Sequence, residues 1–105
     1  MENNIKDKLI ELRELIGKKE RWTQGASARD KEGKKVLSTE EEAVSWCISG
    51  GINKVLMYSK FEEQRDIRTI IQNSLPEGYK AIGKFNDKST HEEVINMLNR
   101  VIDKL

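Results

Sequence analysis

The segment from Trp22 to Asp30 constrains the fold of this 105-residue chain more than any other. It carries one large aromatic side chain, several small residues and no helical spacing of apolar residues. Small side chains let a backbone approach its own core or a ligand closely, and irregular segments on a rigid scaffold often carry chemistry. We therefore expect a helical protein with one irregular segment, at which other parts of the chain or a ligand come close.

Helical spacing of apolar residues predicts a first and a third helix. The first ends near Gly17, which suits a helix C-terminus, and the third runs from about Phe61 to Asn73. A last helix begins at Thr90, which with Glu93 forms a candidate capping box. The apolar faces of the first and last helices consist of Ile5, Leu9, Leu12 and Ile16, and of Val94, Met97, Leu98, Val101 and Leu105.

A second capping box, Thr39 with Glu42, predicts that another helix begins there. Its apolar residues continue to Leu56 and are too many for one narrow face, which indicates a largely buried helix. Gly50 and Gly51 lie in its middle, where each costs about 1 kcal/mol relative to alanine. Either the helix breaks at these glycines, or another backbone packs closely against them.

The two remaining segments show little periodicity. Residues 22–36 contain a turn at Asp30-Lys31-Glu32-Gly33 that would suit a short hairpin, and Tyr79 to Phe85 is predicted to be a loop or a brief strand. The predicted fold is mainly α, with about four helices in a single compact domain over residues 1–105. An irregular segment, with a short hairpin as its candidate structure, follows the first helix.

Composition excludes several classes of function. The chain has 19 Lys and Arg, 18 Asp and Glu, and a net charge of +1, so a nucleic-acid partner is disfavoured. One cysteine and one histidine provide neither a disulfide nor a transition-metal site, and the glycines form no nucleotide-binding loop. We expect no metal and no cofactor. With no signal peptide and no apolar run of about 20 residues, a cytoplasmic location and no membrane partner are expected.

Cys47 and His91 are the only candidates for a catalytic pair. A thiolate nucleophile needs a base, and that base needs an orienting side chain, which Asn86 or Asp87 could supply. The competing interpretation is that Cys47 is a small buried hydrophobe, because it lies between Trp46 and Ile48 inside the predicted apolar helix. The second interpretation is favoured.

A binding cluster is the other candidate site. It comprises Trp22 for stacking, Gln24 for amide hydrogen bonds and Arg29 for gripping an anion, together with Asp30, Trp46, Asn86 and Asp87. The alternative is that Trp22 fills the core, while Arg29 and Asp30 pair with each other or hold a turn.

Three motifs in this order resemble a family of small bacterial and phage proteins classed as a domain of unknown function. They are Trp22-Thr23-Gln24-Gly25-Ala26-Ser27-Ala28-Arg29-Asp30, then Ala43-Val44-Ser45-Trp46-Cys47-Ile48-Ser49-Gly50, and Phe85-Asn86-Asp87 followed by Thr90-His91-Glu92-Glu93-Val94. Phe85 replaces an expected Trp, Gly51 replaces an expected Ala, and the position of His91 is not tied to histidine in that family. The resemblance implies a fold and a set of clustered residues, but no reaction.

The favoured function is a noncatalytic binding or protein-interaction module, with a phage or mobile-element accessory protein as its context. Its partner would be an unidentified protein or small molecule. One alternative is a small cysteine-dependent hydrolase or transferase that uses Cys47. The other is a helical homo-oligomer, in which the first and last helices pack their apolar faces against a second copy.

Overall fold

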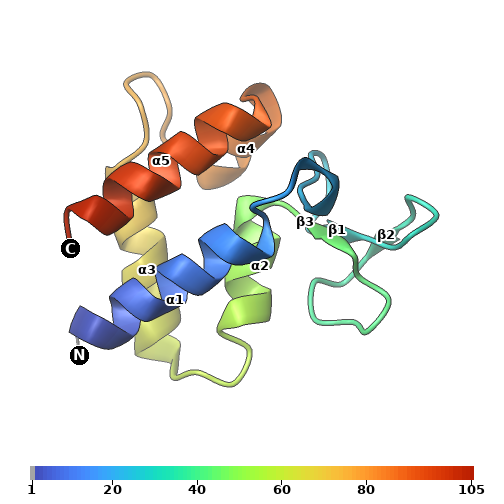
Figure 1. Ribbon diagram of the computed structural model, residues 1–105, viewed down its shortest axis with the longest axis horizontal. Coiled ribbons are helices and arrows are strands. Elements are labelled where there is room, and N and C mark those ends of the chain that lie inside the picture. The colour runs from blue at the N-terminus through green and yellow to red at the C-terminus, as the bar shows by residue number, and fades with distance from the viewer. Residues whose placement is uncertain (1) are drawn as a thin grey trace.

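In the computed structural model, which describes residues 2–105 and the side chains of residues 4–105, helices surround one hydrophobic core beside a small sheet (Figure 1). The described residues contain five α-helices and a three-stranded antiparallel sheet. The helices are α1 (Glu2–Leu15), α2 (Ile48–Val55), α3 (Phe61–Asn73), α4 (Ile82–Lys88) and α5 (His91–Asp103), with a short 3-10 helix η1 (Lys19–Arg21). The strands are β1 (Ala28–Arg29), β2 (Lys35–Val36) and β3 (Ser45–Trp46). The mainly helical class is confirmed, with one helix more than expected.

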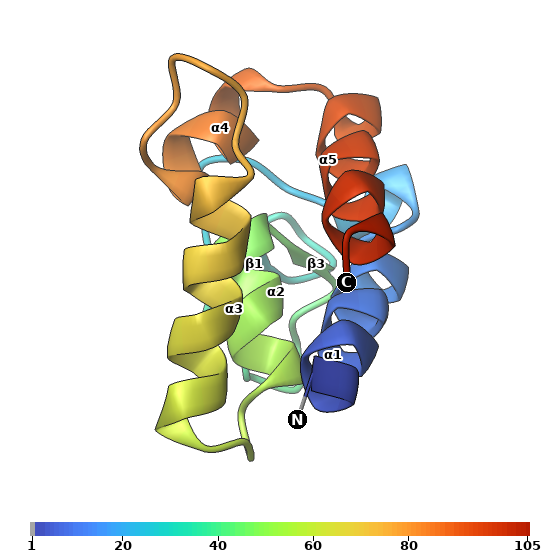
Figure 2. The same ribbon diagram turned by 90° about the vertical axis from the view of Figure 1, so that its left-hand side faces the viewer.

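The first and last helices pack against each other within the chain, and α1 also contacts α2 and α3. Figure 2 shows α3 on one side of the molecule and α1 with α5 on the other. The predicted apolar faces form the core, except that Ile5 is half-buried and Leu105, after the end of α5, is exposed. The fully buried members are Leu9, Leu12, Ile16, Val94, Met97 and Leu98. No helix of residues 2–105 is long and apolar enough to cross a bilayer.

The local signals at the third and last helices are confirmed. Helix α3 has the predicted bounds. Glu93 N donates to Thr90 Oγ1 at 3.1 Å, and Thr90 N donates to Glu93 Oε1 at 2.8 Å, so both halves of the capping box are present.

The hairpin is also confirmed. β1 pairs antiparallel with β2 on one edge and with β3 on the other. Between β1 and β2, Gly33 has a φ of 84°, in the left-handed region that favours glycine. One carboxylate oxygen of Asp30 accepts from the amides of Glu32 and Lys34 at 2.9 Å, which holds the turn.

The second predicted helix is present over Ile48–Val55, but its predicted start at Thr39 is wrong. Residues 39–42 form turns, β3 follows, and α2 begins only at Ile48. The physical reason is tertiary: Val44 N donates to Arg29 O at 2.9 Å and Cys47 N donates to Ser27 O at 3.2 Å, so this backbone pairs with the β1 segment.

Another backbone packs closely against the glycine pair inside α2, as one of the two expectations for these glycines stated. A Cβ on Gly50 would lie 1.9 Å from the carbonyl oxygen of Ser27. The irregular segment therefore presses its backbone directly onto the central helix, and only glycine leaves room for this contact.

The expectation of a loop or brief strand from Tyr79 to Phe85 is confirmed for residues 79–81 and wrong for the rest, because α4 begins at Ile82. This helix has only seven residues, too few to display a clear apolar period. Its burial of Phe85 and Asn86 depends on contacts with distant segments.

Candidate functional site

Asn86 of α4 is completely buried, and its side chain joins α4 to two segments that are distant in the sequence. Its Oδ1 accepts from Trp22 Nε1 at 2.8 Å and from Ile48 N at 3.0 Å. Its Nδ2 donates to Thr23 O at 3.0 Å and to Asp87 Oδ1 at 3.1 Å. Because Ile48 N is one of the amides at the start of α2 that lack a partner within the helix, Asn86 completes the N-terminus of that helix.

Gln24 and Asp87 extend this network to the surface. Gln24 Nε2 lies 3.0, 3.1 and 2.9 Å from the carbonyl oxygens of Asn86, Asp87 and Ser89. Those carbonyls lie at the C-terminal end of α4, where a helix leaves acceptors unpaired. Asp87 Oδ1 accepts in return from Gly25 N at 3.0 Å. We call Trp22, Gln24, Asn86 and Asp87, with the Thr23 carbonyl and Ile48 amide, the Asn86 cluster.

Arg29 holds the irregular segment in shape. Its guanidinium donates to Thr23 Oγ1 at 2.9 Å, to Gln24 O at 3.0 Å and to Gly33 O at 3.0 Å. Nε, Nη1 and Nη2 therefore each donate to a neutral oxygen of the protein, and these are the nitrogens that would bind an anion. Asp30 holds the adjacent turn, so the hydrogen bonds of both side chains lie within the local structure.

Trp46 and Cys47 support the start of α2. The indole of Trp46 is buried and donates to Ser38 O at 2.9 Å. Cys47 is the N-cap of α2, and its Sγ accepts from Gly50 N at 3.2 Å. Burial raises the pKa of the Cys47 thiol above its ordinary value of 9.0, and Asp87 adds to the rise, while the amides of Gly50 and Ser49 oppose it. The thiol therefore resists forming the thiolate that nucleophilic chemistry requires.

His91 is engaged with other groups. Its Nε2 lies 2.7 Å from the carbonyl oxygen of Ile16, and its ring packs on Trp22 with a centroid distance of 5.6 Å. The imidazole thus joins α5 to the end of the first helical segment.

The structure brings together most of the residues predicted from sequence. Trp22, Gln24, Asn86 and Asp87 meet, and the start of α2, which directly follows Trp46 and Cys47, joins them through the amide of Ile48. Asp30 and the Trp46 indole lie outside this network, because Asp30 accepts from Glu32 N and the indole donates to Ser38 O. In residues 4–105 every buried side-chain nitrogen and oxygen has a hydrogen-bond partner, and no three His, Cys, Asp or Glu side chains of the described chain gather as metal ligands.

Sequence reasoning missed a different surface, at the connection between α2 and α3. Met57, Tyr58 and Phe61 are 36%, 92% and 75% exposed, within five residues of chain. We call these three side chains the α2–α3 corner. A signal was present, because Phe61 lies about 120° around α3 from the buried Ile67 at 3.6 residues per turn. An aromatic residue so far out of phase with the core face is a candidate for binding.

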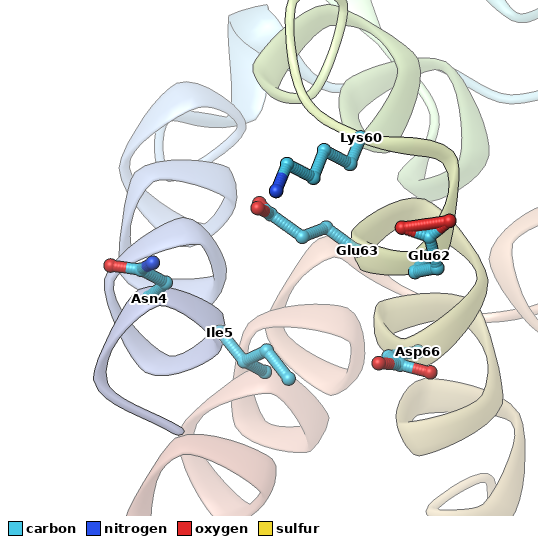
Figure 3. A pocket seen from close by; sticks show the side chains of 6 residues that line it. All are labelled: Asn4, Ile5, Lys60, Glu62, Glu63 and Asp66. Atoms are coloured by element: carbon cyan, nitrogen blue, oxygen red, sulfur yellow. The ribbon is translucent and has the colours of Figure 1, made fainter. Parts of the chain in front are cut away.

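A shallow groove of ≈ 310 Å³ lies beside this corner, between the start of α1 and the start of α3 (Figure 3). Figure 3 shows Lys60 and Glu63 extending from the start of α3 toward α1, with Ile5 on the opposite side. The lining residues are Asn4, Ile5, Lys60, Glu62, Glu63 and Asp66. The corner therefore combines exposed aromatic side chains with an adjacent hollow that carries both signs of charge.

The sequence matches the model of a known family. The model of DUF6197, a family of unknown function, matches residues 1–104. The chain belongs to this family. Membership confirms the resemblance to a family of unknown function and assigns the chain no reaction, ligand or partner. No curated protein and no solved structure matches this DUF6197 chain.

Proposed function

We propose that this protein is a noncatalytic protein-interaction module that binds its partner through the α2–α3 corner. The observation that carries the proposal is the exposure of Tyr58 and Phe61, at 92% and 75%. Tyr and Phe are enriched at protein interfaces, since each covers a large area with little loss of conformational entropy. The chain has six aromatic residues, and exposing two of them at one connection between helices is costly in water unless another surface covers them.

The noncatalytic part of the proposal rests on Cys47 and His91. The thiol is buried and accepts from a backbone amide, and burial raises its pKa. The imidazole of His91 is hydrogen-bonded to Ile16 O. Neither group is arranged to activate a nucleophile, so a cysteine-dependent hydrolase or transferase has little support.

In this proposal the Asn86 cluster holds the fold instead of binding a ligand. The Oδ1 and Nδ2 atoms of Asn86 each have two hydrogen-bond partners inside the protein. This leaves the Asn86 carboxamide no capacity to bind a ligand. A ligand role for the exposed Gln24 and Asp87 stays a prediction, as does a phage or mobile-element context.

Photo-crosslinking tests the proposal. Tyr58→p-benzoylphenylalanine, expressed in cells that produce the protein, is expected to form protein adducts on irradiation. The matched control is Leu37→p-benzoylphenylalanine, because Leu37 is also an exposed apolar residue, at 67%, but lies after β2. No adduct at position 58, or equal adducts at both positions, would contradict the proposal.

A further inference from the structure

We propose that the partner at the α2–α3 corner is a second copy of this chain, so that the protein forms a two-fold symmetric dimer. This inference rests on the proposed function, because it names the occupant of the same surface. It requires that the surface is large enough, complementary to itself and reachable by a second molecule.

The first requirement is area. A fully buried Tyr or Phe side chain covers about 150–250 Å², so Tyr58 and Phe61 with part of Met57 supply about 400 Å² of apolar surface. The groove beside them enlarges the contact. A weak specific interface buries about 600 Å² or less on each partner, so the corner alone would supply about two thirds of that area.

The second requirement is self-complementarity. A two-fold interface places the same patch on both molecules, so a residue away from the axis meets a different residue of the second copy, and the pairing is reciprocal. The corner suits this because three cations and three carboxylates lie along residues 54–66: Lys54, Lys60, Arg65, Glu62, Glu63 and Asp66. A patch of one sign would repel its copy, whereas this balanced set can oppose cation to carboxylate.

The charges nearest the groove also lack strong partners inside the chain. Among residues 4–105, Lys60, Glu62 and Glu63 make no ion pair within 4.0 Å, and Arg65 reaches Asp66 only at 3.9 Å. Lys60 and Glu63 extend into the space between α3 and α1 (Figure 3). They are available to a second molecule, without the energetic cost of breaking an internal pair.

The third requirement is access. The connection between α2 and α3 lies at one end of the molecule in both ribbon views, with α4 at the opposite end (Figures 1 and 2). Two copies can therefore meet at this end while their Asn86 clusters remain distant from the interface. This dimer differs from the homo-oligomer considered from the sequence, in which the first and last helices would pack against a second copy. In the structure the apolar faces of α1 and α5 are buried in the core of their own chain.

Sedimentation equilibrium of the purified chain at about 1–200 μM is the decisive measurement. A reversible monomer–dimer equilibrium with a Kd of about 1–100 μM is expected for an interface at the lower end of the size range. Tyr58→Ser combined with Phe61→Ser should weaken dimerisation at least about tenfold, since aromatic anchors dominate such interfaces. Leu37→Ser, the exposed apolar control, should leave the dimer unchanged.

Lys60→Glu provides a second test that leaves the apolar residues in place. It should also weaken dimerisation, because it adds a fourth carboxylate to each patch and removes a cation. A wild-type chain that stays monomeric at about 200 μM would overturn the inference. A dimer whose Kd is unchanged by the aromatic and Lys60 substitutions would also overturn it. If Tyr58 crosslinks only to a different protein, the second copy is excluded while the proposed function stands.

Discussion

Trp22 Nε1 donates to Asn86 Oδ1 at 2.8 Å, across 64 positions of the sequence. The same oxygen accepts from the first amide of α2 at 3.0 Å, so one buried carboxamide joins the irregular segment, the central helix and α4. Buried amides are costly to leave without partners. The Asn86 cluster should therefore dominate the stability of this part of the fold.

Asn86→Ala should lower the free energy of unfolding by about 3 kcal/mol or more, because Trp22 Nε1, Ile48 N and Thr23 O each lose a buried partner worth about 1–3 kcal/mol. Urea unfolding followed by tryptophan fluorescence measures the change. Asn96→Ala on the exposed face of α5 is the control and should change stability by less than about 0.5 kcal/mol. Similar losses for both variants would show that the cluster contributes little.

Three glycine-to-alanine variants should differ in sign as well as size. Gly50→Ala should destabilise by several kcal/mol, since its Cβ would lie 1.9 Å from Ser27 O, a backbone atom. Gly51→Ala should cost less, because its Cβ meets the end of the Leu12 side chain at 2.6 Å. Gly83→Ala in α4 meets nothing within 4 Å and should stabilise by about 0.5–1 kcal/mol. Thermal unfolding of the three variants tests this order, and a tolerated Gly50→Ala would contradict the close approach.

Cys47 should make stability depend on pH in the alkaline range. Its pKa is raised in the folded protein, so the unfolded chain releases the proton first and is favoured as pH rises above 9.0. The stability that wild type has relative to Cys47→Ala should thus be constant below pH 9.0 and shrink above it. Comparing the two proteins cancels the other titrating groups. A difference that grows with alkaline pH would mean that the folded protein favours the thiolate.

The same burial should slow the reaction of Cys47 with a thiol reagent. At pH 8, labelling should be at least about a hundredfold slower than in urea-unfolded protein, because the thiol is both covered and protonated. Labelling as fast as in the unfolded chain would restore the case for a reactive cysteine.

Thr90→Ala should cost about 0.5–2 kcal/mol, since it removes the side chain that accepts from Glu93 N at the start of α5. Thr90→Ser should recover most of this loss because it keeps the hydroxyl. Thr69→Ala, on the exposed side of α3, serves as the control in the same unfolding measurement. Equal stability of the Ala and Ser variants at position 90 would show that the cap is not what stabilises α5.

The sequence by itself determined the features that local chemistry encodes. Apolar spacing gave the core faces of α1 and α5, Thr90 with Glu93 specified a helix start, and Asp30 with Gly33 specified the hairpin turn. Each signal acts between residues a few positions apart, so it does not require contacts with distant parts of the chain. The same logic failed at Thr39 and Glu42, which have the spacing of a capping box but no helix after them.

Only the tertiary structure decided where the ambiguous segments went. Residues 43–47 pair with the β1 segment instead of forming helix, and residues 82–88 become helical as Phe85 and Asn86 are buried. Both outcomes depend on partners that are distant in sequence, such as Ser27 O for Cys47 N and Trp22 for Asn86. The exposure of Tyr58 was decided in the same way, because an aromatic residue in a connection between helices is buried or exposed according to which elements pack beside it. Phe61 differs, since its position around α3 already set it apart from the buried Ile67.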